Sequence, residues 1–435
     1  MFKRLVDAFK DKELRKKIFI TIGLVLIYRL GCWIVVPGLN PTAFKESLGV
    51  GDELTFMTLL NSISGGALAN GAIFALGVSP YISSSIIIQL LTLVIPGLQR
   101  LSRLGEEGKQ KMSTYTKYCA LVLATIQAVA IVLSYQSIIN TEIGPAWLIS
   151  IMVVLILVAG SMGTYWLGEK ITEAGVSNGL SLLIFVGILS TFGNSLYNTL
   201  FAANGLFNGN LHQLVNIAYF LVALIVIFGF IVFMDQAERK IPVQYAKQIK
   251  GRKMYGGQST YIPVKVNSTG VMPIIFAMTF ISLPQILISL FAPNSQSGFS
   301  KFINQYIGTQ SWLYFILMAI FIIGFAYFWA QITFNPVDIS KNIQQNGGFI
   351  PGIRPGKATA DYLKKISNRI TLFGAIFLAL IAMIPSLIFK IIGDGTLVTA
   401  FSATGLLIVV SVAIELDKQL EAQMLMKNYK GFLNK

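Results

Sequence analysis

The feature that most constrains the fold of this chain is a series of long apolar stretches without a single charged residue. Residues 54–99 and 174–234 contain no aspartate, glutamate, lysine or arginine, and six further stretches of at least 20 residues share this property. Backbone amides exposed to lipid have no water to bond, so a chain crosses a bilayer only as helices or as a closed barrel. Stretches of this length therefore predict an all-α polytopic membrane protein.

A transmembrane helix needs about 20 mainly apolar residues, and this length divides the chain into ten predicted transmembrane helices. The stretch 174–234 holds two of them, because the polar segment 204–213 interrupts it. The predicted spans lie near 18–36, 78–97, 117–137, 146–166, 180–200, 213–234, 269–291, 312–334, 370–390 and 398–415.

Composition and charge agree with lipid as the solvent. Only 12% of the 435 residues are charged, whereas a soluble domain has about a quarter of its residues charged. The formal net charge is nevertheless +15. With ten spans, every second connecting segment and both termini lie on the same side of the membrane, and these segments hold 30 of the 34 lysines and arginines. The positive-inside rule assigns this side to the cytoplasm, which predicts a plasma-membrane protein with both termini cytoplasmic. These segments are 1–17, 97–117, 167–178, 235–267, 335–369 and 416–435.

Catalytic chemistry is nearly excluded. The chain has no GxxxxGK[ST] motif, and its single histidine, His212, rules out a HExxH zinc site. We therefore predict no catalytic residue, no metal and no cofactor. Arg29 is the one charged residue well inside a predicted span, where snorkelling or pairing with backbone carbonyls is expected. A secondary transporter for a small apolar or amphipathic solute remains open at this point.

Two predicted cytoplasmic loops, 235–267 and 335–369, are long and basic. Such loops offer a cationic docking surface to an acidic partner, including RNA. If the charges served only to orient the protein in the membrane, this would explain why the loops are positive but not why they are so long. In the second loop, the prolines and glycines of PGIRPG predict a tight turn with Arg354 near its tip. The N-terminal segment 1–17 is predicted to be either a basic amphipathic helix on the inner membrane surface or an orientation signal.

Four motifs in order along the chain resemble the SecY family of protein-conducting channels. They are SPYISSSIIIQLL at 79–91, WLGEKITEAGVSNGLS at 166–181, QSTYIPVKVN at 258–267 and GGFIPGIRPG at 347–356. The resemblance runs nearly from end to end. One departure is GEEGKQK at 105–111, where the family usually has a paired arginine after the second glycine, so a contact made by those arginines is in doubt here.

The resemblance implies two inverted five-helix halves, 18–204 and 205–415, around an hourglass pore, followed by a cytoplasmic tail, 416–435. It also implies that the re-entrant segment 57–76 is a plug that closes the pore. Its glycines weaken a helix by up to about 1 kcal/mol each, and its lack of charge suits an apolar seal; a re-entrant hairpin that never moves is the alternative. The plug residues implied are Asn61, Ser64, Gly65, Gly66, Ala67, Leu68 and Asn70.

The resemblance further implies a ring of aliphatic side chains at the waist of the pore. Val78 and Leu180 stand where the family has isoleucine at some ring positions, and plain buried core is the alternative for the whole set. A lateral gate toward lipid is implied between the helices 78–97 and 269–291. The ring residues are Val78, Ile82, Leu180, Ile184, Ile275 and Ile408, and the gate residues are Ser83, Ser84, Ser85, Gln89 and Thr279.

Partners are implied in the same way. The two basic loops would dock a SecA ATPase or a translating ribosome, with Arg354 coupling to the motor and Arg252 and Lys253 contacting ribosomal RNA. SecE-like and SecG-like small membrane subunits, signal peptides, nascent chains and the lipid bilayer complete the expected partners. The remaining candidate docking residues are Arg239, Lys240, Lys247 and Lys250.

Overall fold

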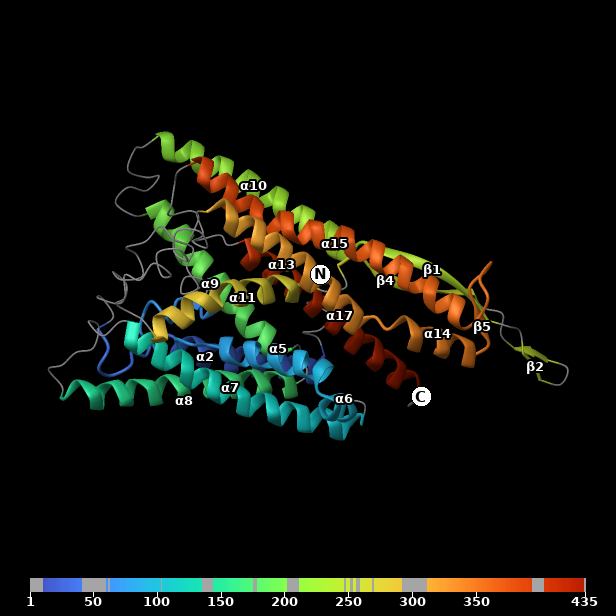
Figure 1. The fold of residues 1–435 in the computed structure, drawn as a ribbon, viewed down its shortest axis with the longest axis horizontal. Coiled ribbons are helices and arrows are strands. Elements are labelled where there is room, and N and C mark those ends of the chain that lie inside the picture. Colours follow the sequence, from blue (N-terminus) through green and yellow to red (C-terminus); the bar gives the residue numbers. More distant parts are fainter. Residues whose placement is uncertain are drawn as a thin grey trace. The chain divides into compact units, whose positions relative to one another are not determined.

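The fold is mainly helical, as the sequence predicts (Figure 1). The structure is a computed structural model that describes residues 11–40, 60–61, 63–102, 104–134, 144–174, 178–201, 211–245, 248–250, 253–255, 259–267, 270–291, 311–392 and 403–433. The helices are α2 (Lys12–Gly31), α5 (Ser79–Val94), α6 (Pro96–Ser102), α7 (Glu106–Ser134), α8 (Ala146–Ala174), α9 (Gly179–Phe201), α10 (Leu211–Gln236), α11 (Met272–Phe291), α13 (Trp312–Thr333), α14 (Pro336–Gln345), α15 (Lys357–Ile392) and α17 (Ala403–Leu433).

Five short strands, which the sequence analysis did not predict, lie in the two basic loops. Strand β1 (Glu238–Tyr245) pairs antiparallel with β4 (Ser259–Lys265) on one edge and with β5 (Gly348–Phe349) on the other. The strands β2 (Gln248–Lys250) and β3 (Lys253–Tyr255) form a separate antiparallel pair. The β1–β5 pairing joins the two loops, so each loop is held by residues about a hundred positions away in sequence.

The chain forms two compact units. The first comprises Met1–Gln213, Thr279–Tyr314 and Phe389–Lys435, and the second comprises Leu214–Met278 and Phe315–Ile388. The predicted division into halves at 18–204 and 205–415 remains a prediction.

Within the described residues, four helical segments are long and apolar enough to cross a membrane, and a fifth would be added by the bent pair α5 and α6. The four are Glu106–Leu133, Ala146–Ala174, Trp312–Gln345 and Lys357–Met383. Shorter apolar helices lie at Gly179–Asn194, Ile225–Gln236 and Met272–Ile281. A multi-pass membrane protein is thereby supported, while the number of ten spans remains a prediction.

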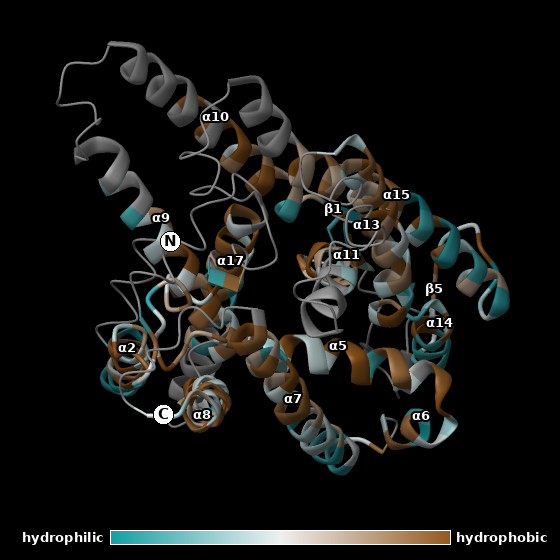
Figure 2. Ribbon diagram, turned by 60° about the vertical axis from the view of Figure 1, so that its left-hand side comes forward, coloured by the Kyte–Doolittle hydropathy of each residue, from teal (hydrophilic) through white to brown (hydrophobic). Residues whose placement is uncertain are grey.

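The outer faces of these helices are apolar. On α8, Trp147 is 66% exposed and Leu155 is 64% exposed, and Trp312 and Ile320 of α13 are similarly exposed. Figure 2 shows hydrophobic residues along the helices and hydrophilic residues at one end of α7 and of α15. Large exposed apolar side chains of this kind fit contact with lipid rather than water.

In the second unit, the small sheet packs on α14 and the first turns of α15. Ile241 and Val243 of β1, together with Ile343 of α14 and Leu363 of α15, belong to one buried apolar cluster. Asn335 caps α14 by accepting a hydrogen bond from the Val337 amide at 3.2 Å, with proline at the first helical position. This cluster gives the two basic loops a folded support.

We predict that Leu363→Ala loosens this support. Truncation of a fully buried leucine costs about 2–5 kcal/mol, and Leu363 is completely buried. Trypsin should therefore cut the loops 235–267 and 335–369 of the purified protein faster in this variant. Asp361→Ala, at an exposed position two residues earlier on the same helix, is the control, and its loops should be cut at the parent rate. Equal rates for both variants would show that the cluster does not hold the loops.

Candidate functional site

The segment 60–77 lies in the first unit between α2 and α5. It is helical at residues 60, 61 and 63 and continues as turns over 64–77; Ser62 lies outside the described residues. The residues that follow α2 lie antiparallel to part of this segment. The Val36 amide donates to the Gly71 carbonyl at 2.8 Å, and the Ile73 amide donates to the Ile34 carbonyl at 2.9 Å. These two bonds flank an antiparallel bridge between Val35 and Ala72 and fix the segment to the chain that follows α2.

Side chains within the segment replace the hydrogen bonds that a helix would have made. The Ala69 amide donates to Asn61 Oδ1 at 2.9 Å, and the Leu68 amide donates to Ser64 Oγ at 3.3 Å. Gly65, at φ 70°, adopts the left-handed conformation that favours glycine. Local polar side chains that compete with the helical pattern are typical of turns, so this segment folds as a series of turns.

Polar groups of the surrounding helices bind the carbonyls of the segment. Tyr28 of α2 donates its hydroxyl to the Ser64 carbonyl at 3.3 Å. Arg29 donates through Nη1 to the Gly65 carbonyl at 3.3 Å and through Nη2 to Ser190 Oγ of α9. The prediction that Arg29 pairs with a backbone carbonyl is confirmed. The arginine therefore contacts a segment 36 residues away and a helix 161 residues away in sequence.

The end of the segment is bound to α8. Thr164 Oγ1 donates to the Gly77 carbonyl at 2.8 Å, and Ser161 Oγ donates to the same oxygen at 3.2 Å. Both side chains are buried. Gly77 directly precedes Val78, so these two bonds also set the position at which α5 begins.

Glycines on three helices make room for the segment. A Cβ atom on Gly31 of α2 would overlap the Phe74 ring, and one on Gly160 of α8 would overlap the Ile73 carbonyl oxygen. A Cβ atom on Gly187 of α9 would overlap the Ile63 carbonyl oxygen. Small residues allow backbones to approach closely in a membrane bundle, and here they form the seat of the segment.

Three of the six predicted ring residues lie together beside this segment. Val78, at the N-cap of α5, is 2% exposed and belongs to one apolar cluster with Ala67 and Ala72 of the segment. Ile82, one turn further along α5, and Leu180, at the start of α9, are partly buried and pack against the same cluster.

The other three ring residues are placed separately. Ile184 is buried on α9, one turn after Leu180, and Ile408 is buried on α17, which packs against α9. Ile275 lies on α11 and is partly buried within the second unit. A closed ring of all six side chains therefore remains a prediction.

The predicted gate residues differ from one another in their surroundings. Ser84 is completely buried and donates to the Thr116 carbonyl of α7 at 2.6 Å, so in this structure it joins α5 to α7. Gln89 donates to Ser85 Oγ at 3.4 Å within α5. Ser83 and Thr279 are partly buried. The gate itself remains a prediction.

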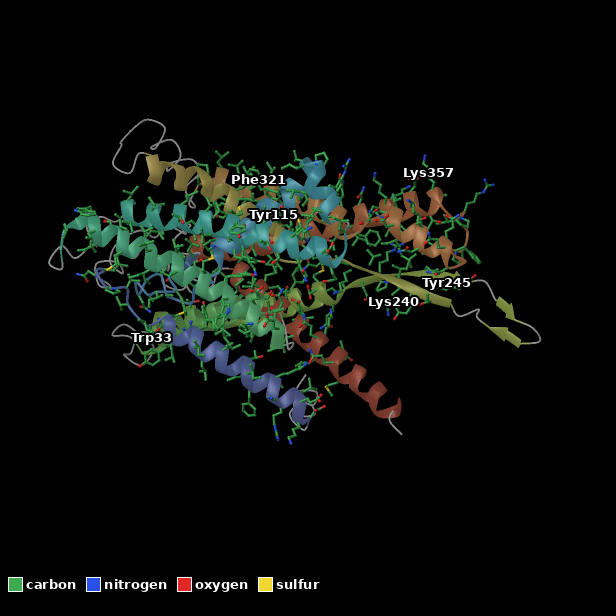
Figure 3. All side chains as sticks on the ribbon, turned by 90° about the horizontal axis from the view of Figure 1, so that it is seen from below. Trp33, Tyr115, Lys240, Tyr245, Phe321 and Lys357 are labelled. Carbon is green, nitrogen blue, oxygen red and sulfur yellow. The ribbon has the colours of Figure 1, made fainter. Side chains whose placement is uncertain are left out.

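Three docking candidates lie on strand β1 and on the turn before α15, and Figure 3 labels one of them, Lys240. Arg239 and Lys240 of β1 are exposed, and Lys240 Nζ lies 4.8 Å from the centre of the Tyr261 ring on β4. Arg354 is exposed in the turn before α15, where its carbonyl accepts a hydrogen bond from Thr359 Oγ1 at 2.9 Å. The turn thus holds Arg354 outward from a fixed backbone.

The remaining docking candidates are only partly described. Lys250 and Lys253 face each other in the register of β2 and β3. Lys247 and Arg252 lie outside the described residues.

The sequence analysis missed a polar cluster that joins the middle of α7 to the last turns of α8. Lys117 Nζ lies 2.9 Å from Glu169 Oε1, and the Tyr165 hydroxyl donates to the same oxygen at 3.2 Å. The Tyr165 ring also stacks on Tyr81 of α5, with centroids 4.4 Å apart. The sequence could have indicated this ion pair, because Lys117 and Glu169 have opposite charges and lie at the ends of neighbouring predicted spans.

Known proteins resemble this chain over nearly its whole length. The profile of the SecY family matches residues 72–416. The protein translocase subunit SecY of Mycobacterium bovis is 40% identical over 450 residues, with 100% of both chains covered. The protein translocase subunit SecY of Streptomyces griseus is 39% identical over 445 residues, again with 100% of both chains covered.

Solved structures share the fold. One, described as the structure of a protein conducting channel, has a TM-score of 0.65 and is 19% identical in sequence. The match covers 93% of this chain and 91% of that chain. Sec61 in a canine ribosome–channel complex has a TM-score of 0.59 and is 18% identical in sequence. The match covers 93% of this chain and 91% of the Sec61 chain. These structures are therefore similar in architecture across both units of the chain.

We predict that Gly160→Ala destabilises the protein, because the new methyl group would displace the Ile73 carbonyl from its seat. Overpacking of this kind costs about 1–3 kcal/mol, and thermal unfolding of the purified protein measures the loss. Gly163→Ala on the same helix is the matched control, since its methyl group would meet the Phe74 ring at an ordinary 3.5 Å. A Gly160→Ala variant as stable as this control would contradict the close approach.

Proposed function

The chain belongs to the SecY family, and from this membership we propose that it is the channel subunit of a protein translocase. It passes unfolded secretory polypeptides across the plasma membrane and releases transmembrane segments sideways into lipid. The single observation that carries this proposal is the uncharged apolar cluster of Val78, Ile82 and Leu180, with segment 60–77 packed against it.

An aliphatic waist suits a channel for unfolded protein. Val78, Ile82 and Leu180 present no hydrogen-bond donor or acceptor, so a passing chain of any sequence meets no specific binding site. A narrow apolar constriction also disfavours water and ions, because it dewets. In the proposed channel, Ile184, Ile275 and Ile408 complete this ring.

Segment 60–77 is the proposed plug. It is held by bonds from side chains and by two bridge-like backbone bonds rather than by a continuous helix, so it can leave without unfolding a spanning helix. Its buried residues Ala67 and Leu68 carry no charge and pack into the apolar clusters of the first unit. These properties support a seal that is displaced when a substrate enters.

Sideways release into lipid follows from partition. Each central leucine, isoleucine, phenylalanine or valine of a nascent segment contributes about 0.3–0.6 kcal/mol in favour of the membrane. A gate between α5 and α11 that exposes the chain to lipid would therefore separate membrane segments from secreted ones. Ser83, Ser84, Ser85, Gln89 and Thr279 are the proposed residues of this gate.

The energy for translocation comes, in this proposal, from a partner at the cytoplasmic side, because the chain has no nucleotide-binding motif. The exposed basic residues Arg239, Lys240 and Arg354 offer a docking surface for a SecA ATPase or a ribosome. SecE-like and SecG-like subunits are proposed to accompany the chain. Arg252 and Lys253 are the proposed contacts to ribosomal RNA.

A photo-crosslinking amino acid at Ile82 tests the proposed pore. An arrested secretory chain should crosslink to Ile82, because the chain must pass the waist. Leu155, which is exposed on the outer face of α8, is the control position and should give no crosslink to the same chain. Crosslinking at neither position, combined with uptake of a small solute, would instead favour a secondary transporter.

We predict that Arg354→Glu blocks export driven by the motor ATPase in inverted membrane vesicles, because it reverses the charge at the tip of a rigid turn. Membrane insertion of the variant itself should persist. Lys341→Glu is the matched control, since Lys341 is exposed on α14 in the same loop and carries the same charge. Normal export by Arg354→Glu, or an equal loss in both variants, would refute a specific role for Arg354.

A further inference from the structure

Arg29 has an unusual position in the chain. It is the only charged residue in the stretch 18–44 and lies near the end of α2. An arginine within an apolar span is unfavourable unless it finds partners. Neither the ring, the gate nor the docking surface described above makes use of this residue.

The guanidinium of Arg29 connects three elements of the first unit. From α2, it donates to the Gly65 carbonyl of segment 60–77 and to Ser190 Oγ of α9. A guanidinium carries five donors in a planar fork, so one side chain can hold two acceptors at fixed positions. A lysine would offer a single nitrogen at this site.

The backbone around Arg29 is shaped for this connection. A Cβ atom on Gly65 would lie 2.9 Å from the Gly187 Cα atom of α9, and it would also overlap the guanidinium. Two glycines thus allow the segment to approach α9, three residues before Ser190. The adjacent Ser64 carbonyl accepts from Tyr28, so two consecutive carbonyls of the segment are bound by two consecutive residues of α2.

We propose that Arg29 is a clamp that holds segment 60–77 in its closed seat and releases it when water enters the pore. This inference rests on the proposed function, because it names the residue that sets the closed state of the plug. In the closed seat the guanidinium is partly buried and keeps its two protein acceptors, since removing a charge from water without partners is unfavourable. When a translocating chain brings water, water can replace these acceptors and the clamp weakens.

Cys32 provides a native reporter of the seat. Its side chain is 1% exposed, belongs to the same apolar cluster as Ala67 and Ala72, and lies with its Sγ 3.7 Å from the Ser64 carbonyl oxygen. Departure of the segment would uncover this thiol. Cys119 is the only other cysteine of the chain, so a Cys119→Ser background leaves Cys32 as the single reactive site.

The experiment measures the rate at which a polar maleimide modifies Cys32 in the complete channel complex in lipid nanodiscs, together with resting conductance in planar bilayers. Arg29→Gln should accelerate modification by at least about tenfold, which corresponds to ~1.4 kcal/mol of lost closed-state stability. Ser190→Ala and Arg29→Lys, which each lose one of the two contacts, should give smaller increases. Resting conductance should rise in the same order.

Ser150→Ala is the matched control for Ser190→Ala. The Ser150 hydroxyl is exposed and donates only within its own helix, to the Ala146 carbonyl at 2.8 Å. Its modification rate and conductance should equal those of the parent. A serine-to-alanine change is also mild enough to preserve insertion, so Ser190→Ala decides the question if Arg29→Gln does not accumulate.

Deletion of residues 61–72 separates failure of the clamp from failure of the plug. If the deletion exposes Cys32 and leaks ions while Ser190→Ala and both Arg29 variants match the parent, the clamp is refuted and the proposed function stands. If the deletion changes neither measurement, segment 60–77 is not the seal and the clamp is refuted with it. Graded increases in the variants, below the level of the deletion, support the clamp.

Discussion

Every backbone carbonyl that leaves the helical pattern inside a membrane bundle must find another donor, and the first unit of this protein is arranged around that requirement. Lipid cannot supply the missing hydrogen bonds. Residues 64–77 are not helical, yet the carbonyls of Ser64, Gly65 and Gly77 accept bonds from Tyr28, Arg29 and Thr164. These donors come from α2 and α8, so the same bonds that satisfy the segment also hold the helices around it.

Close packing accompanies this hydrogen bonding. Glycines at 31, 160 and 187 remove the side chains that would otherwise keep the segment away from α2, α8 and α9. The apolar side chains of Ala67 and Ala72 then reach the cluster that contains Val78. A seat built from small residues and a few directed bonds suits the proposed role of this segment as a plug.

In the second unit, the main structural feature is the support of the two basic loops. Its basic loops would be mobile if they were held only at the helix ends, but β1 pairs with β4 and with β5 and thereby joins both loops. The apolar cluster beneath this sheet includes Leu363 at the start of α15. Exposed cations such as Lys240 and Arg354 therefore project from a folded support, which gives the proposed docking surface a defined shape.

The sequence by itself determined the class of protein and many of its special positions. Long uncharged stretches require a helical membrane protein, the four motifs indicate the family, and a lone Arg29 within a span requires polar partners. These conclusions depend on composition and on residues near one another in the chain, so they can be drawn before folding is considered. The strands in the basic loops escaped prediction because the β1–β5 pairing joins residues about a hundred positions apart.

Only the tertiary structure decided which groups meet. Arg29 binds Gly65 and Ser190, residues 36 and 161 positions away, and Ser84, a candidate for the gate, donates to the Thr116 carbonyl of α7. Lys117 and Glu169 form an ion pair across 52 positions. The direction of a side chain from a helix depends on how that helix is rotated against its neighbours, and packing sets this rotation only when all the helices are present.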